Sequence, residues 1–258
     1  MGVFLDPFNH LGGNFEINYN LLQCHQDLGY AMKEIAFVIK IGLILSLMVG
    51  WILPADATNL KTIQQLLETK DCHSSLWKYC NLEGANLQGL DLSNTNLSGA
   101  NLKQANLREA SLKYANLSGA DLRQANLENT NLLRANLNKA KLSEANLTQS
   151  SLLEVNLTLA NLSYANLEKA KLLGARLWGT NLSQANLTNA SLRGTNLQYA
   201  NLENSNLSFA DVNSLLFRDA TQFTDLSNAN LQGANLEGVH LETVILQGAV
   251  MPDGSIHE

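Results

Sequence analysis

Two cysteines close together, Cys72 and Cys80, are the residues of this sequence best suited to chemistry. They are eight positions apart and lie at the start of a long repetitive stretch. In an oxidising compartment such a pair can form a small disulfide that ties the repeat to the segment before it. Two alternatives stay open. Cys80 fills a small buried position while Cys72 stays free, or both bind zinc with His73, for which no fourth ligand is apparent.

The other ionisable residues form no recognisable catalytic, metal or cofactor site. The histidines after residue 57 are His73, His240 and His257, and none has the spacing of a nucleophile, metal ligand or acid–base pair. The sequence has no Gly-rich phosphate loop, and its scattered carboxylates are typical of solubilising surface charge. We therefore expect no catalytic residues, no metal and no cofactor, and we expect that the protein is not an enzyme.

A five-residue repeat dominates the chain. Leu stands at every fifth position from Leu82 to Leu207, 26 times, and Val212 takes the next place. A period of five matches neither a helix nor a sustained strand. The residue two before each Leu is usually Ala, however, and residues two apart face the same side of extended backbone. The chain must turn once per unit, which predicts a solenoid with the Leu and the small residue inside.

The residue before each Leu indicates how many units make one coil. Every fourth unit from Asn86 to Asn206 has Asn here, whereas the next set, from Asp91 to Asp211, has Asn only at Asn131. A super-period of 20 residues is what four units per coil produce, so we expect a four-sided coil. Asn tolerates unusual backbone angles and bonds locally to main chain, which suits a position beside a turn.

The phrases ANLKQ, ANLSG and ADLRQ resemble the A(D/N)LXX unit of the pentapeptide-repeat family. The resemblance covers roughly residues 75 to 251. It implies an all-β fold, a right-handed quadrilateral β-helix with the central Leu and the preceding small residue pointing inward. Among members of the family, the chain resembles exported cyanobacterial-type proteins. These often carry closely spaced cysteines at the start of the solenoid, although the gap between Cys72 and Cys80 is wider.

The rest of the chain divides into segments around this repeat. Residues 58–70 predict a short amphipathic helix that covers the open end of the solenoid. The expected segments are an N-terminal extension (1–31), a signal peptide or membrane anchor (32–57), a helical cap with a degenerate first repeat (58–79), the main repeat (80–217), a register break (218–224), a second run of repeats (225–251) and a tail (252–258).

The repeat changes phase after Val212. Phe217 keeps the register, but the next central residue, Leu226, follows nine positions later instead of ten. We predict that one residue has been dropped near Ala220–Phe223 and that Phe223 turns inward. The alternatives are a tight corner or a loop with a functional purpose. In the tail, the sequence Pro-Asp-Gly at 252–254 predicts a turn that ends the solenoid.

Residues 35–53 are the one stretch apolar enough for a membrane. Lys40 interrupts it and leaves 13 uncharged residues, which is short for a spanning helix but fits the apolar region of a secretory signal. Ala55 and Ala57 follow in an A-x-A cleavage pattern. We expect export with Thr58 as the mature N-terminus, and the family resemblance implies the periplasm or thylakoid lumen. The alternatives are an uncleaved membrane anchor through residues 35–53 and a buried core helix.

Large apolar residues recur at outward positions in the middle of the repeat. Leu133, Leu153 and Leu173 share one outward position on three successive coils. Outward positions of the following face hold Leu159, Trp178 and Tyr199. Most other outward positions are polar, so we predict an exposed apolar stripe where a protein partner docks. The alternative is that these residues only stack and cover one another.

Charge argues against nucleic acid as a partner. Residues 80–217 contain 11 basic and 10 acidic residues, a net charge of +1, and no basic face is dominant.

We expect a non-enzymatic structural or protein-interaction solenoid that is exported, with an unknown protein or a second copy as partner. One alternative is a membrane-tethered scaffold. Another is a DNA mimic acting on DNA gyrase, as the resemblance implies for some members, but this needs a strongly acidic surface.

Overall fold

The computed structural model describes residues 57–72, 80–217 and 220–258. The expected extension at 1–31, the apolar stretch 35–53 and Ala55 lie outside the described residues. The described residues belong to one compact unit, Ala55–Glu258. In this part of the chain no helix combines the length and hydropathy needed to cross a bilayer.

Helix α2 (Ala57–Thr69) precedes the repeat, where the sequence predicts a helix over 58–70. It ends where Lys70 takes a left-handed backbone conformation, with φ of 55°, and donates its amide to the Leu66 carbonyl. Leu66 is buried in the same core cluster as the repeat leucines, and Ile63 and Leu67 pack against that core. The apolar side of α2 therefore joins the solenoid core, while its role as a cap stays a prediction.

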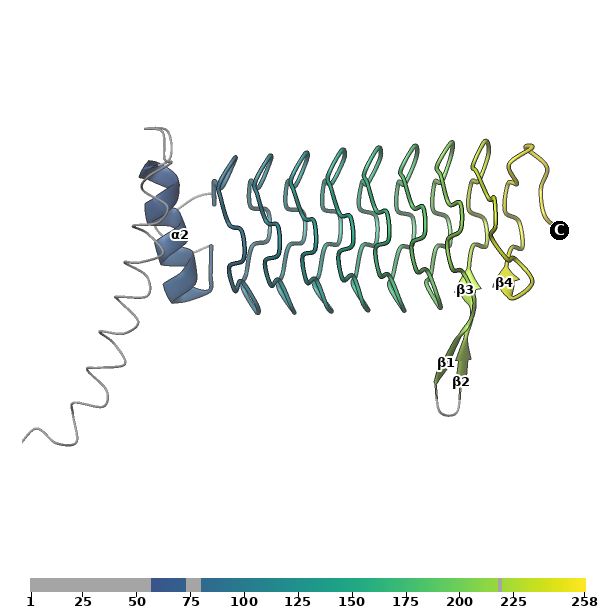
Figure 1. Ribbon diagram of the computed structural model, residues 1–258, viewed down its shortest axis with the longest axis horizontal. Coiled ribbons are helices and arrows are strands. Elements are labelled where there is room, and N and C mark those ends of the chain that lie inside the picture. Colours follow the sequence, from purple (N-terminus) through teal and green to yellow (C-terminus); the bar gives the residue numbers. More distant parts are fainter. Residues whose placement is uncertain (1–56, 73–79, 218–219) are drawn as a thin grey trace, which may run out of the picture. The chain divides into compact units, whose positions relative to one another are not determined.

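The repeat coils into a four-sided parallel β-helix with 20 residues per coil (Figure 1). Parallel bridges join residues 20 apart, such as Asn86 to Asn106 and Asn106 to Asn126. The predicted four units per coil are confirmed, and the right-handed sense stays the one that the family resemblance implies. We number the faces first to fourth by the inward leucines Leu82, Leu87, Leu92 and Leu97, respectively.

The core consists of the predicted inward residues. The 26 leucines at every fifth position from Leu82 to Leu207 have at most 1% of their surface exposed. Burying one such side chain contributes about 1.5–3 kcal/mol, which chain entropy largely offsets. The residue two before each Leu is buried as well in nearly every unit, and Thr130 and Thr180 at this position donate their hydroxyls to main-chain carbonyls inside the coil. Polar residues at the small inward position can therefore form hydrogen bonds although they are buried.

Each corner of the coil depends on two residues. The side-chain oxygen of the residue before Leu accepts an amide two positions later, as Asn131 does from the Leu133 amide at 3.1 Å. The second residue after Leu takes positive φ, for example 58° at Leu159. Local bonding by Asn is thus confirmed. The expectation of unusual backbone angles at Asn is wrong, because the left-handed residue comes three positions later.

The change of phase is an insertion, and the predicted deletion is wrong. Bridges join Asn196 to Asp225 and Asn201 to Asn230, 29 residues apart instead of 20. The nine extra residues form an antiparallel hairpin of β1 (Leu215–Phe217) and β2 (Ala220–Gln222), which projects from the coils in Figure 1. Nine inserted residues shift a five-residue register by the same amount as one deletion, so the sequence alone could not separate the two.

The insertion also moves the expected boundaries. Phe223 is 47% exposed, so its predicted inward orientation is wrong, and Thr224 fills the buried position beside Leu226. Phe217 belongs to the hairpin and not to the solenoid register. The main repeat therefore ends at 214, and the interruption covers 215–223 where 218–224 was expected.

The coil resumes after the hairpin and ends in a turn. β3 (Thr224–Asp225) pairs in parallel with β4 (Val244–Ile245), one coil later. In the tail, Asp253 accepts the Ser255 amide, and Ile256 pairs antiparallel with Val250. The turn predicted from Pro-Asp-Gly is confirmed. The chain after this turn folds back along the last coil and pairs with part of its edge.

Candidate docking surface and disulfide

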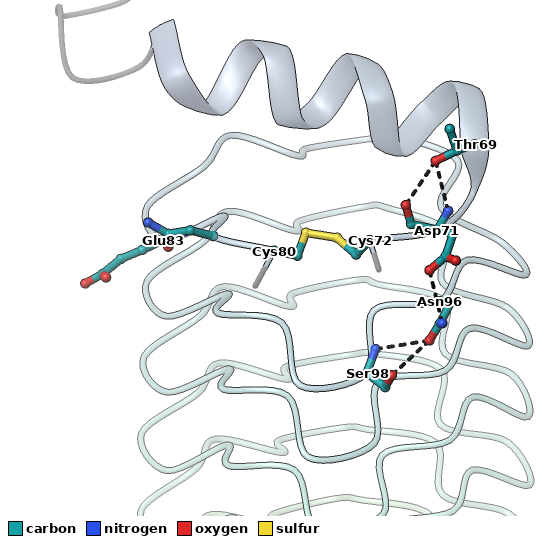
Figure 2. Close-up of a disulfide and its surroundings, with 8 residues drawn as sticks. Thr69, Asp71, Cys72, Cys80, Glu83, Asn96 and Ser98 are labelled. Atoms are coloured by element: carbon teal, nitrogen blue, oxygen red, sulfur yellow. Dashed lines mark hydrogen bonds between the residues drawn. A yellow bond between two sulfur atoms is a disulfide. The ribbon is translucent and has the colours of Figure 1, made fainter. Parts of the chain in front are cut away.

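A disulfide joins Cys72 and Cys80 at the start of the solenoid (Figure 2). Both residues are buried, and their Cα atoms are 5.3 Å apart. The Cys72 amide donates to the Asn96 carbonyl at 3.0 Å, and the Asn96 side-chain amide donates to Asp71 at 3.1 Å. The short segment after α2 is thus held to the first coil by the disulfide and by main-chain and side-chain hydrogen bonds.

The zinc alternative gains no support from the described residues. Across 57–72, 80–217 and 220–258, no three His, Cys, Asp or Glu side chains are grouped so that they could hold a metal ion. His73 lies outside the described residues. Cys80 occupies the inward position that Ala takes in most units, and its sulfur is committed to Cys72.

The six predicted patch residues lie on two adjoining faces. Leu133, Leu153 and Leu173 are half-buried on the third face. On the fourth face Leu159, Trp178 and Tyr199 are 45%, 41% and 56% exposed. The structure brings the rings of Trp178 and Tyr199 together edge-to-face, with centroids 5.6 Å apart. Substantial apolar and aromatic surface remains open to solvent despite this contact.

The hairpin adds Leu215 at the corner between these two faces. Gly174 and Gly194 form this corner on successive coils, and Leu215 lies over both. A Cβ at Gly194 would lie 2.7 Å from the Cβ of Leu215, so glycine is required for this close approach. The Gln222 side-chain amide donates to the Gly194 carbonyl at 2.6 Å and fixes the base of the hairpin. Leu215 thereby lies between the apolar residues of the third and fourth faces.

Basic residues border this surface. Arg134 donates to Glu154 at 2.8 Å, and this carboxylate raises the pKa of Arg134 above its ordinary value. Lys171 and Arg176 are exposed, and no ion pair reaches either of them within the described residues. They stand two positions before Leu173 and Trp178, respectively. The patch therefore combines apolar and aromatic groups with unpaired positive charge.

The family model of pentapeptide repeats matches this chain in 8 copies, over residues 78–113, 115–152, 140–179, 170–208 and 224–253. The matches cover more than half of the chain. The chain belongs to the pentapeptide-repeat family.

Solved structures of pentapeptide-repeat proteins are similar to this chain. HetL of the cyanobacterium Nostoc, involved in regulating heterocyst differentiation, is 30% identical over 76% of this chain and 98% of its own, with a TM-score of 0.49. QnrB1, a plasmid-mediated fluoroquinolone resistance protein, is 24% identical over 68% and 83%, with a TM-score of 0.36. A thylakoid-lumen protein of Arabidopsis thaliana is 30% identical over 42% and 68%, with a TM-score of 0.21. No curated protein sequence matches the chain.

This pentapeptide-repeat chain also exposes aromatic residues that the sequence analysis did not single out. Tyr114, Tyr164 and Phe209 stand two positions after an inward Leu, at left-handed corner positions. Tyr164 lies on the first face and Phe209 on the second, away from the patch. The corner position itself was the available signal, because its side chain has to point outward.

Proposed function

We propose that this pentapeptide-repeat protein is a non-enzymatic, exported solenoid that binds protein through its third and fourth faces. The observation that carries the proposal is the exposed Trp178–Tyr199 pair beside the apolar third face. Aromatic residues and Arg are enriched in the centres of protein interfaces, and a contiguous apolar area on a polar surface is typical of a docking site. The described repeat otherwise presents mostly polar corners and ladders of Asn.

Stacking alone accounts for only part of this surface. Leu133, Leu153 and Leu173 on the third face are half-buried at equivalent positions of successive coils. Trp178 and Tyr199 keep about half of their surface open after they have met, so their exposure is not removed by neighbours. The unpaired Lys171 and Arg176, together with the near-neutral repeat, disfavour DNA mimicry, which requires an acidic surface.

Replacing Leu153 and Trp178 together by Ser should abolish partner binding without unfolding the protein, because both side chains lie outside the core. Partner binding is measured by crosslinking from a photo-reactive amino acid placed at Thr158 of the full chain, which is expressed in its own host. We expect at least a tenfold loss of the crosslinked species, identified by mass spectrometry. Tyr164→Ser, an exposed aromatic on the first face, is the matched control. Equal crosslinking in both variants would rule out the patch.

Export has a separate measurement. The intact mass of the protein from its host should correspond to a chain that begins at Thr58, with Cys72 and Cys80 resistant to alkylation until a reductant is added. This outcome would support cleavage after Ala57 and an oxidising compartment together. A mass that retains residues 35–53, with both thiols free to react, would favour the membrane-tethered or intracellular alternative.

A further inference from the structure

The fourth face carries one straight ladder through the patch. The residues that precede its inward leucines are neighbours on successive coils, joined by parallel bridges. In order they are Asn156, Arg176, Asn196, Asp225 and Ile245. Each step of such a ladder is about 4.8 Å. The nine-residue hairpin leaves the ladder unbroken, because Asp225 bridges directly to Asn196.

Charge along this ladder changes sign about its centre. Arg176 lies one step before Asn196, and Asp225 lies one step after it. Two ladder steps separate them by about 10 Å, and no ion pair joins them within the described residues. Asp225 accepts hydrogen bonds from Gln198 at 2.6 Å and from Ser227, and no ion pair reaches it within the described residues. Arg176 and Asp225 therefore each lack an oppositely charged partner within the described residues.

Two large side chains of the same face have small residues at the equivalent steps beyond the centre. Trp178, one step before the centre, corresponds to Ser227, one step after it. Leu159, two steps before, corresponds to Gly248, two steps after. Tyr199 stands at the central step itself. Trp178 and Leu159 thus have small residues at the equivalent positions beyond the centre.

We propose that the fourth face is a self-complementary interface that joins two antiparallel copies of this chain about a twofold axis at Asn196. Rotation about that axis places Arg176 of each copy against Asp225 of the other, so that both charges gain a partner. It also places each Trp178 against Ser227 of the second copy. A twofold interface requires such a surface, in which one patch complements itself.

The hairpin does not cover this face. Its base lies at the corner formed by Gly194, at the edge between the third and fourth faces. Trp178, Tyr199 and Ile245 remain 41%, 56% and 40% exposed on the fourth face itself. The inference rests on the proposed function, since it uses part of the same surface, and it goes further by naming a second copy as the occupant.

A photo-reactive amino acid at Gln198, beside the proposed axis, tests the inference in the full chain. Two copies with different tags are expressed together in the host, and crosslinks between the tags are measured. We expect crosslinked peptides that link position 198 to residues near Asn196 and Tyr199 of the other copy. Arg176→Glu or Asp225→Lys, made in both copies, should each lower this crosslinking at least tenfold, because like charges then oppose each other.

Combining the two variants separates interface charge from misfolding. A copy with Arg176→Glu and a copy with Asp225→Lys should crosslink to each other as the unaltered copies do, because opposite charges meet at both contacts again. Lys fits at 225, since Lys141 and Lys171 occupy equivalent positions before an inward Leu. Lys141→Glu on the first face is the control for net charge and should have no effect.

The outcomes separate this inference from the proposed function. Absence of crosslinks between copies, or failure of the two variants to restore them, would overturn the twofold interface. If position 198 crosslinks only to a different protein, the second copy is the wrong occupant while docking through the patch stands. If the Leu153 and Trp178 substitutions also leave every crosslink unchanged, docking through the patch is overturned as well.

Discussion

Replacing Leu152 by Ala should lower the free energy of unfolding by about 2–5 kcal/mol. Leu152 is 1% exposed in the middle of the solenoid, and the equivalent positions one coil before and after are filled by Leu132 and Leu172. Each coil touches only its two neighbours, so the rest of the fold cannot close around the cavity by moving a distant element. Chemical denaturation of the full chain, followed by circular dichroism, measures the loss.

The adjacent residue supplies a matched control. Leu153 is also leucine in the same unit, but it lies half-buried on the outside of the third face. Leu153→Ala should cost less than about 1 kcal/mol, since surface substitutions away from special features have small effects. Equal losses for Leu152→Ala and Leu153→Ala would contradict the assignment of inward and outward positions along the repeat.

The parts of this fold that follow from sequence are those set by a repeated local rule. Leu82 and Leu207 occupy the same position in their five-residue units because each unit adds one strand and one corner, so counting alone identifies the core. The residue before Leu, such as Asn86, reports the number of units per coil because like residues stack. Outward columns follow from the same counting, which places Leu153 and Trp178 on neighbouring faces from the sequence alone.

The parts that sequence could not supply are those where the rule is interrupted. The hairpin at 215–223 contributes its own antiparallel pairing and has a length one short of two units, so it resembled a missing residue. The position of Leu215 over Gly194, at the corner between the third and fourth faces, therefore does not follow from the repeat. The charge relation of Arg176 to Asp225 was hidden for the same reason, since the two become ladder neighbours of Asn196 only when the insertion is recognised.

The disulfide lies where the solenoid begins, and the bonds around it show what it stabilises. The Lys70 carbonyl accepts the Asn96 amide, and the Cys72 amide donates to the Asn96 carbonyl. The segment after α2 thus pairs with the fourth face of the first coil, whose strand edge would otherwise be open. Cys72 and Cys80 are eight residues apart, so their bond closes a short loop and limits the freedom of this segment in the unfolded chain.

Removing this bond should destabilise the start of the solenoid by about 2–3 kcal/mol. This is the free energy that corresponds to the conformational entropy which a closed loop of this length removes from the unfolded chain. Cys80→Ala is the informative variant, because Ala occupies the same inward position in 18 of 27 units from Cys80 to Ala210 and keeps the packing. Hydrogen exchange should accelerate at the Leu82 amide, which donates to the Asn101 carbonyl in the next coil.

The change should fade along the rod, because coils are coupled only to their neighbours. The amide of Leu142, several coils away, should exchange at the same rate in Cys80→Ala and in the unaltered protein. A reductant should reproduce the effect of Cys80→Ala in the unaltered chain and add nothing to the variant. If the first coil exchanges equally fast with and without the bond, hydrogen bonds from residues 70–72 and the packing of Leu66 hold α2 in place by themselves, and the disulfide does not stabilise the end of the solenoid.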